Sequence, residues 1–110
     1  MIIDKDENIT IITQEKLSVT ALVKAIESSY DKFKNHHIIV SLTSIKSISL
    51  QDIIEFLRVS NAHRSDNKSF VIITDEVNLD EMPDELVVVP TMQEAYDIIE
   101  MEDIERDLGF

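Results

Sequence analysis

Ile38-Ile39-Val40-Ser41-Leu42 is the stretch that decides the fold of this chain of 110 residues. The run is short, uncharged and rich in β-branched residues, which is typical of a strand covered on both faces. A second run of this kind, Phe70-Val71-Ile72-Ile73-Thr74, follows, and a third, Leu86-Val87-Val88-Val89, ends at Pro90. Short buried strands that alternate with helices indicate the α/β class.

Amphipathic segments separate these strands. Within Leu17–Lys34 the apolar residues recur every three or four positions, which predicts a helix that Ser18 or Thr20 can cap. Ser49 and Asp52 come close to a capping box, and they predict a helix from Leu50 to about Ala62.

A third helix is predicted at the C-terminus. Thr91 and Glu94 form a Thr-x-x-Glu capping box, and Gly109 falls where a left-handed C-cap is preferred. This helix buries the residues Ala95, Ile98 and Ile99. At the other end of the chain, Ile2–Asp4 and Ile9–Thr13 predict a hairpin.

The order ββ-α-β-α-β-β-α predicts an α/β sandwich with a mixed, mostly parallel sheet of about five strands and three to four helices. No linker, internal repeat or low-complexity tract interrupts the chain. We therefore expect a single domain, residues 1–110, that ends in an acidic helical segment over residues 91–110.

The net charge of −12 is confined to one part of the chain. Residues 1–74 carry nine acidic and nine basic side chains, whereas residues 75–110 carry thirteen acidic side chains and one basic one, Arg106. Such a field repels nucleic acid and anionic membranes, so we expect neither as a partner.

Composition excludes several kinds of chemistry. Gly109 is the only glycine, which rules out glycine-rich phosphate loops, and the absence of cysteine rules out disulfides and thiolate metal sites. We expect no cofactor. The N-terminus lacks the features of a signal peptide and no run approaches the ~18 apolar residues of a membrane span, so a cytoplasmic protein is the default.

The histidines do not predict a metal or catalytic site. His36 and His37 are adjacent, so on a strand they point to opposite faces and cannot chelate one ion together. We expect them to be surface or strand-edge residues. His63 lies near the end of the second helix, where it would favour the helix dipole. The loop Asp75–Glu85 is best interpreted as a solvated acidic loop, since it lacks the ligand spacing and the glycine of an EF-hand.

The order of elements resembles the STAS family, the fold of bacterial anti-sigma factor antagonists. The resemblance lies in His37–Leu42 with the loop after it, in Ser49–Leu57, which looks like the switch helix of the family, and in Val87–Ala95, where a strand and a Pro-Thr pair lead into a last helix. It implies a regulatory module that binds proteins and is not an enzyme.

Active members of the family open the switch helix with Asp-Ser-Ser-Gly, and a partner kinase phosphorylates one of these serines. The matching positions here are Ser49, Leu50, Gln51 and Asp52, so the phosphorylated hydroxyl and the glycine are both missing. Ser49 is the remaining phospho-switch candidate, although a structural N-cap is the better interpretation.

The tail, residues 98–110, is similar to that of short, uncharacterised bacterial proteins, some of which carry a ribonuclease Z label. That enzyme holds two zinc ions with a His-x-His-x-Asp-His cluster. This chain has three histidines and no such motif, so its residues do not support the activity.

The tail also carries an apolar stripe. Met101, Ile104 and Leu108 share one helical face, and Phe110 follows as a latch or an exposed anchor. This face either folds back onto its own domain or docks in the groove of a partner.

The leading hypothesis is a STAS-type interaction module without the serine switch, whose acidic C-terminal region docks an unidentified protein with a basic surface. The partner-binding candidates are Gln51, Asp52, Glu55, Met101, Ile104, Leu108 and Phe110. The alternative is a small-ligand sensor or accessory subunit with a pocket near residues 48–52. The oligomeric state is left open by the sequence.

Overall fold

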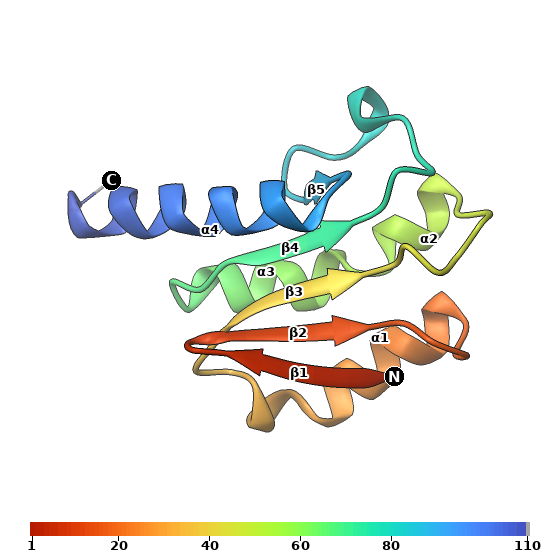
Figure 1. Cartoon of the computed structure of the whole chain (residues 1–110), viewed down its shortest axis with the longest axis horizontal. Coiled ribbons are helices and arrows are strands. Elements are labelled where there is room, and N and C mark those ends of the chain that lie inside the picture. The colour runs from red at the N-terminus through yellow and green to blue at the C-terminus, as the bar shows by residue number, and fades with distance from the viewer. Residues whose placement is uncertain (110) are drawn as a thin grey trace.

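A computed structural model gives the arrangement of residues 1–109, apart from the side chain of Leu79. Five strands form one sheet in the order β1-β2-β3-β4-β5 (Figure 1). Their bounds are β1 Ile2–Asp6, β2 Ile9–Thr13, β3 His37–Ser41, β4 Phe70–Ile73 and β5 Val87–Val89. β1 is antiparallel to β2, and all other neighbouring pairs are parallel. The predicted mixed, mostly parallel sheet is confirmed.

Helices cover both faces of this sheet. They are α1 Val19–Ser28, α2 Leu50–Ile54, α3 Leu57–Ser65 and α4 Met92–Asp107, with short 3-10 turns at Tyr30–Lys32 and Leu79–Glu81. The first three helices pack on one face, and α4 alone packs on the other. In Figure 1 the last turns of α4 extend past the ends of the strands. Within residues 1–109 no helix is both long and apolar enough to cross a membrane.

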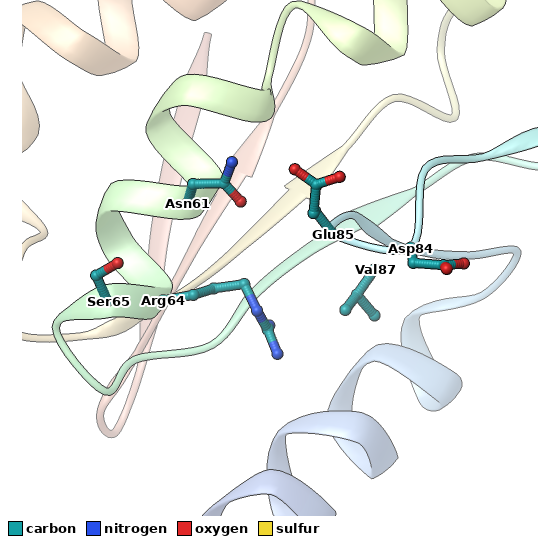
Figure 2. Close-up of a pocket in the computed structure, with 6 residues that line it drawn as sticks. All are labelled: Asn61, Arg64, Ser65, Asp84, Glu85 and Val87. Atoms are coloured by element: carbon teal, nitrogen blue, oxygen red, sulfur yellow. The ribbon is translucent and has the colours of Figure 1, made fainter.

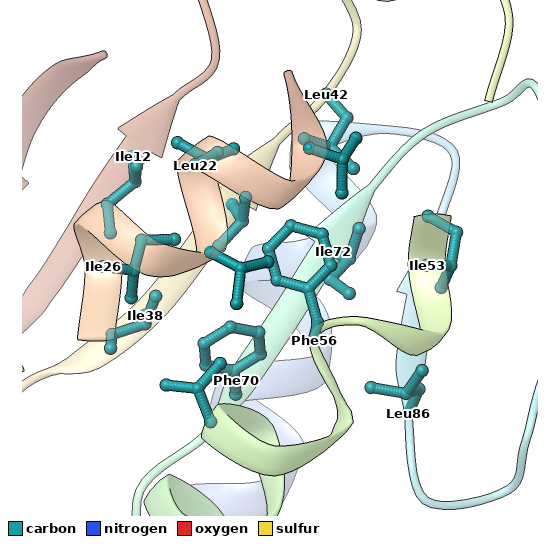
Figure 3. Packing of buried hydrophobic residues seen from close by; sticks show 14 of the residues in the cluster. Ile12, Leu22, Ile26, Ile38, Leu42, Ile53, Phe56, Phe70, Ile72 and Leu86 are labelled. Carbon is teal, nitrogen blue, oxygen red and sulfur yellow. The ribbon is translucent and has the colours of Figure 1, made fainter. Parts of the chain in front are cut away.

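β3 is the central strand, and every residue of it is buried. Ile38 and Val40 point into the larger core, where Phe56 and Phe70 lie against each other with ring centroids 6.3 Å apart (Figure 3). Ile39 points the other way, into the smaller core beneath α4. The strand predicted at residues 38–42 is therefore covered on both faces, as expected.

Two predicted helices differ from what their apolar spacing indicates, one by ending early and the other by being divided. The first stops at Ser28, and a 3-10 turn then brings Phe33 into the core with 1% exposure. The second is divided into α2 and α3 between Ile54 and Leu57, and this places both Ile53 and Phe56 in the core. In both places long-range packing overrides the local periodicity.

The predicted N-cap residues are confirmed, although at Thr91 only the half of the predicted capping box made by the Thr91 side chain is found. The Ser18 side chain accepts a hydrogen bond from the Ala21 amide, and the Thr91 side chain accepts one from the Glu94 amide, both at 3.2 Å. Gly109 adopts φ +83°, the left-handed conformation expected of a helix C-cap. Phe110 lies outside the described residues.

We expect Phe56→Ala to lower the free energy of unfolding by about 3–5 kcal/mol, because the ring is fully buried and leaves a cavity. Urea denaturation followed by circular dichroism measures this change. The control is Ile2→Ala, at a side chain that is 46% exposed, which should change the stability far less. Equal effects of the two substitutions would contradict the packing described here.

Candidate functional site

The amino end of α2 lies beyond the carboxyl ends of the parallel strands, the edge at which α/β proteins place binding sites (Figure 1). The Ser49 hydroxyl accepts a hydrogen bond from the Asp52 amide at 3.2 Å, and the Asp52 carboxylate accepts one from the Ser49 amide at 3.1 Å. The predicted capping box is therefore confirmed. The oxygen that a kinase would modify is already used to close the helix.

The other two candidates in this region are exposed. Gln51 lies on the first turn of α2, and the Thr20 hydroxyl lies 2.8 Å from both carboxylate oxygens of Glu55. This contact ties α1 to the end of α2. Beside it is an open hollow of about 380 Å³ that is lined from α1 and from Ile54, Glu55, Leu57 and Arg58. None of its lining residues belongs to the range 48–52, where a ligand pocket was predicted.

At the amino ends of the parallel strands, a half-buried ionic layer lies beneath the second half of α4. Glu102 accepts hydrogen bonds from Arg64 of α3 at 2.6 Å and from the Ser69 hydroxyl at 2.6 Å. Arg106 donates to the Ser69 hydroxyl at 2.9 Å and to Asp103 at 3.0 Å. Burial raises the pKa of Glu102, but the bonds from Arg64 and Ser69 outweigh this effect, and the pKa lies below its ordinary value. We call this network the ionic layer.

His37 belongs to the ionic layer and is only 3% exposed. Its Nδ1 accepts a hydrogen bond from the Ser69 amide at 2.9 Å, and its Nε2 lies 3.0 Å from the Asp103 carboxylate. Because Nδ1 is an acceptor, the ring is neutral and Nε2 carries the proton. Burial lowers the pKa of His37 more than the Asp103 carboxylate raises it. The prediction was a surface or strand-edge position; His37 is the first residue of β3, but it is buried and does not lie at the surface.

His63 is fully buried on the other face of the sheet. Its Nε2 donates to the His36 carbonyl at 2.7 Å, and its Nδ1 accepts from the Tyr30 hydroxyl at 2.6 Å. Burial lowers the pKa of His63, so the ring is neutral. His63 lies in the last turn of α3 and has a structural role, as expected, but it acts through these two hydrogen bonds and not through the helix dipole. His36 bonds to Thr10 at 3.1 Å on this face, so the two adjacent histidines do point to opposite faces, as predicted.

A wide hollow of about 470 Å³ separates α3 from the start of β5 (Figure 2). Asn61, Arg64 and Ser65 line one wall, and Asp84, Glu85 and Val87 line the other. The Arg64 guanidinium is engaged by Glu102, so it does not act as a free anion site. Among the described residues no group of three or more His, Cys, Asp or Glu side chains is placed to hold a metal ion.

The outer face of α4 carries the stripe that the sequence indicated. Met101, Ile104 and Leu108 are 49%, 53% and 67% exposed, so of the two alternatives left open by the sequence this stripe does not fold back onto its own domain. In the first half of the helix the inward residues are apolar, Ala95 and Ile99. The second half reverses this pattern, with charged residues directed inward and apolar residues outward.

The ionic layer was missed by sequence reasoning, although a signal for it existed. Continuing the inward face from Ala95 and Ile99 in steps of three or four reaches Glu102, Asp103 and Arg106. The prediction for this segment followed only its apolar stripe and did not trace the face that continues from Ala95 and Ile99.

Comparison with known proteins shows the STAS-like fold of anti-sigma factor antagonists. No protein-family model matches the chain, and no curated protein matches it. The structure is similar to the NMR structure of TM1081, with a TM-score of 0.64 and 13% identity over 89% of this chain and 86% of that chain. The crystal structure of TM1081, described as a candidate anti-sigma factor antagonist from Thermotoga maritima, has a TM-score of 0.62 and 14% identity over 89% and 92%.

A variant of RsbS from Moorella thermoacetica, in which a serine is replaced by glutamate, has a TM-score of 0.63 and 11% identity over 94% of this chain and 96% of that chain. At these identities the likeness shows the fold alone. The resemblance to STAS proteins is thus confirmed for the fold. The resemblance of residues 98–110 to proteins labelled ribonuclease Z is not tested by these comparisons.

We expect Ser49→Ala to lower the free energy of unfolding by about 1 kcal/mol, because the Asp52 amide loses its acceptor. Ser49→Asp should retain most of the stability, since aspartate is an equally good N-cap. Thermal and urea unfolding measure both variants. If Ser49→Ala and Ser49→Asp have the same free energy of unfolding, the structural role of this hydroxyl is contradicted.

Stability should also fall as the solution becomes more acidic. His37 and His63 have folded pKa values below their ordinary 6.5, so below pH 6.5 the unfolded chain binds protons that the folded chain does not. Their contribution is complete above pH 6.5 and is lost as the pH falls from 6.5 through their folded pKa values. Glu102 adds a second loss below its ordinary 4.5.

Urea denaturation at a series of pH values from about 8 to 5 tests the histidine part. The variant His63→Gln should be less stable at pH 8 but should depend less steeply on pH. A free energy of unfolding that stays constant or rises toward pH 5 would contradict buried neutral histidines.

Proposed function

We propose that this single STAS-like domain, residues 1–110, is a cytoplasmic, non-catalytic regulatory module that binds a protein through the outer face of α4. The observation that carries the proposal is the reversed polarity of the second half of this helix. Three large apolar side chains, those of Met101, Ile104 and Leu108, face solvent, while half-buried charged side chains lie beneath them. An exposed apolar stripe on a well-anchored element favours a binding surface.

Charge supports a basic partner. The net −12 of the chain lies within residues 75–110, and on α4 the stripe is surrounded by Asp97, Glu100, Glu105 and Asp107, all exposed. Such a field attracts a basic protein surface and repels nucleic acid and anionic lipid. Phe110, two residues beyond Leu108, is a candidate for an additional contact.

The region around α2 is the second candidate surface for contact with the partner. Gln51, Asp52 and Glu55 lie where the family resemblance places the partner-facing helix, and Gln51 and Glu55 are exposed. The capping box leaves Ser49 a structural role, so the proposed module acts without a serine phosphoswitch. The alternative, a small-ligand pocket near residues 48–52, would have to use the hollow beside α2, which Ile54 and Glu55 line but residues 48–52 do not.

The test compares proteins captured by the tagged full-length chain with those captured by the double variant Ile104→Gln/Leu108→Gln. We expect the double variant to lose one or more basic proteins that bind directly once purified. The matched control, Ile2→Gln/Ile3→Gln, changes two exposed apolar residues of β1 and should retain them. If all three forms capture the same proteins, the outer face of α4 is not the docking surface.

A further inference from the structure

We infer that the outer face of α4 binds a basic amphipathic helix of the partner, packed side by side with α4 as in a coiled coil. This inference rests on the proposed function and names the partner's binding element. Met101, Ile104 and Leu108 are spaced by three and then four residues, and α4 is continuous to Asp107 with Leu108 as its C-cap. This alternation is the a-d-a pattern of a coiled-coil seam. We call these three residues the outer seam.

The residues beside the outer seam set the charge of the occupant. Glu100 and Asp107 take the g positions and Glu105 takes the e position, so all the flanks are acidic. The one basic residue of this segment, Arg106, is turned inward to Asp103 and Ser69 and does not neutralise the outer face. A second copy of this chain would place carboxylates against carboxylates. A helix with Lys or Arg at its own e and g positions complements these flanks.

An anchor point continues the outer seam toward the edge of the sheet. Val89, Ile98 and Met101 line an open, mostly apolar hollow of about 200 Å³ between β5 and α4. Glu94 and Asp97 complete its lining. The hollow suits one large apolar side chain of the partner, with a basic residue beside it, which is the usual make-up of an energetic hot spot.

The neighbouring edge strand, β5, does not offer a binding surface as long as the outer seam. β5 consists of Val87–Val89 only, which is too short to hold an added strand by main-chain hydrogen bonds over a useful length. The outer seam, in contrast, is rigidly presented, because the ionic layer beneath it fixes the helix from the inner side. A helix can therefore bind without a prior rearrangement of α4.

Two designed peptides of about three heptads test the inference. The first has Leu at a and d and Lys at e and g, and the second has the same composition in an order that forms no seam. Titration of the full chain, followed by fluorescence anisotropy and circular dichroism, should show the first peptide binding at least about tenfold more tightly and gaining helix. Ile104→Gln should weaken this binding about tenfold, and Ile2→Gln should leave it unchanged.

Ile104→Gln should unfold at the wild-type temperature, since Ile104 is 53% exposed, so a loss of binding is not a loss of the fold. Both peptides could bind equally without gaining helix, while Ile104→Gln weakens both. In that case the outer face of α4 still binds a basic partner, but the inference that this partner binds as a helix is overturned. If neither peptide binds, or if Ile104→Gln has no effect, both the helical mode and the proposed docking surface fail.

Discussion

The carboxylate of Glu102 fixes the second half of α4 to the sheet. It accepts hydrogen bonds from the Arg64 guanidinium and the Ser69 hydroxyl, both at 2.6 Å, in a setting where its side chain is only 15% exposed. A carboxylate withdrawn from water in this way is tolerated only when charge and hydrogen bonds compensate for its lost hydration. The ionic layer satisfies that condition and occupies the place that an apolar stripe takes in an ordinary amphipathic helix. For this reason the apolar residues of the second half of α4 are left on the outside.

The two ends of the sheet consequently differ in character. Near the amino end of β3, a neutral buried histidine lies on each face of the sheet. His37 contacts Asp103 of α4 on one face, and His63 is hydrogen-bonded to Tyr30 on the other. Each ring satisfies a backbone group, the Ser69 amide in one case and the His36 carbonyl in the other, so these polar contacts hold the elements in place. The carboxyl end is instead bounded by the exposed start of α2. The proposed binding surfaces on α2 and α4 are thus both attached to well-ordered parts of the fold.

Local patterns predicted the elements better than they predicted the contacts between them. The buried runs around β3 and β4 and the caps at Ser18, Ser49 and Thr91 depend on residues within four positions of one another, and the sequence displays them directly. The contact of His37 with Asp103 joins residues 66 positions apart. Which of two helical faces turns inward depends on such distant partners. For the second half of α4 the apolar stripe therefore does not mark the inward face, because Arg64 and Ser69 compensate for the partly buried charge of Glu102.

A helix that turns half-buried charged residues inward and exposes Met101, Ile104 and Leu108 departs from the pattern that maximises the stability of an isolated domain. Departures of this kind are expected where a surface serves recognition, because the same apolar side chains become buried when a partner binds. The fold that this chain shares with an RsbS variant and TM1081 does not by itself locate such a surface, since it is shared at 11–14% identity. We propose its location instead from this chain's own residues. Ser49 is engaged in the cap of α2, whereas the outer seam of α4 has an apolar face, acidic flanks and a rigid support.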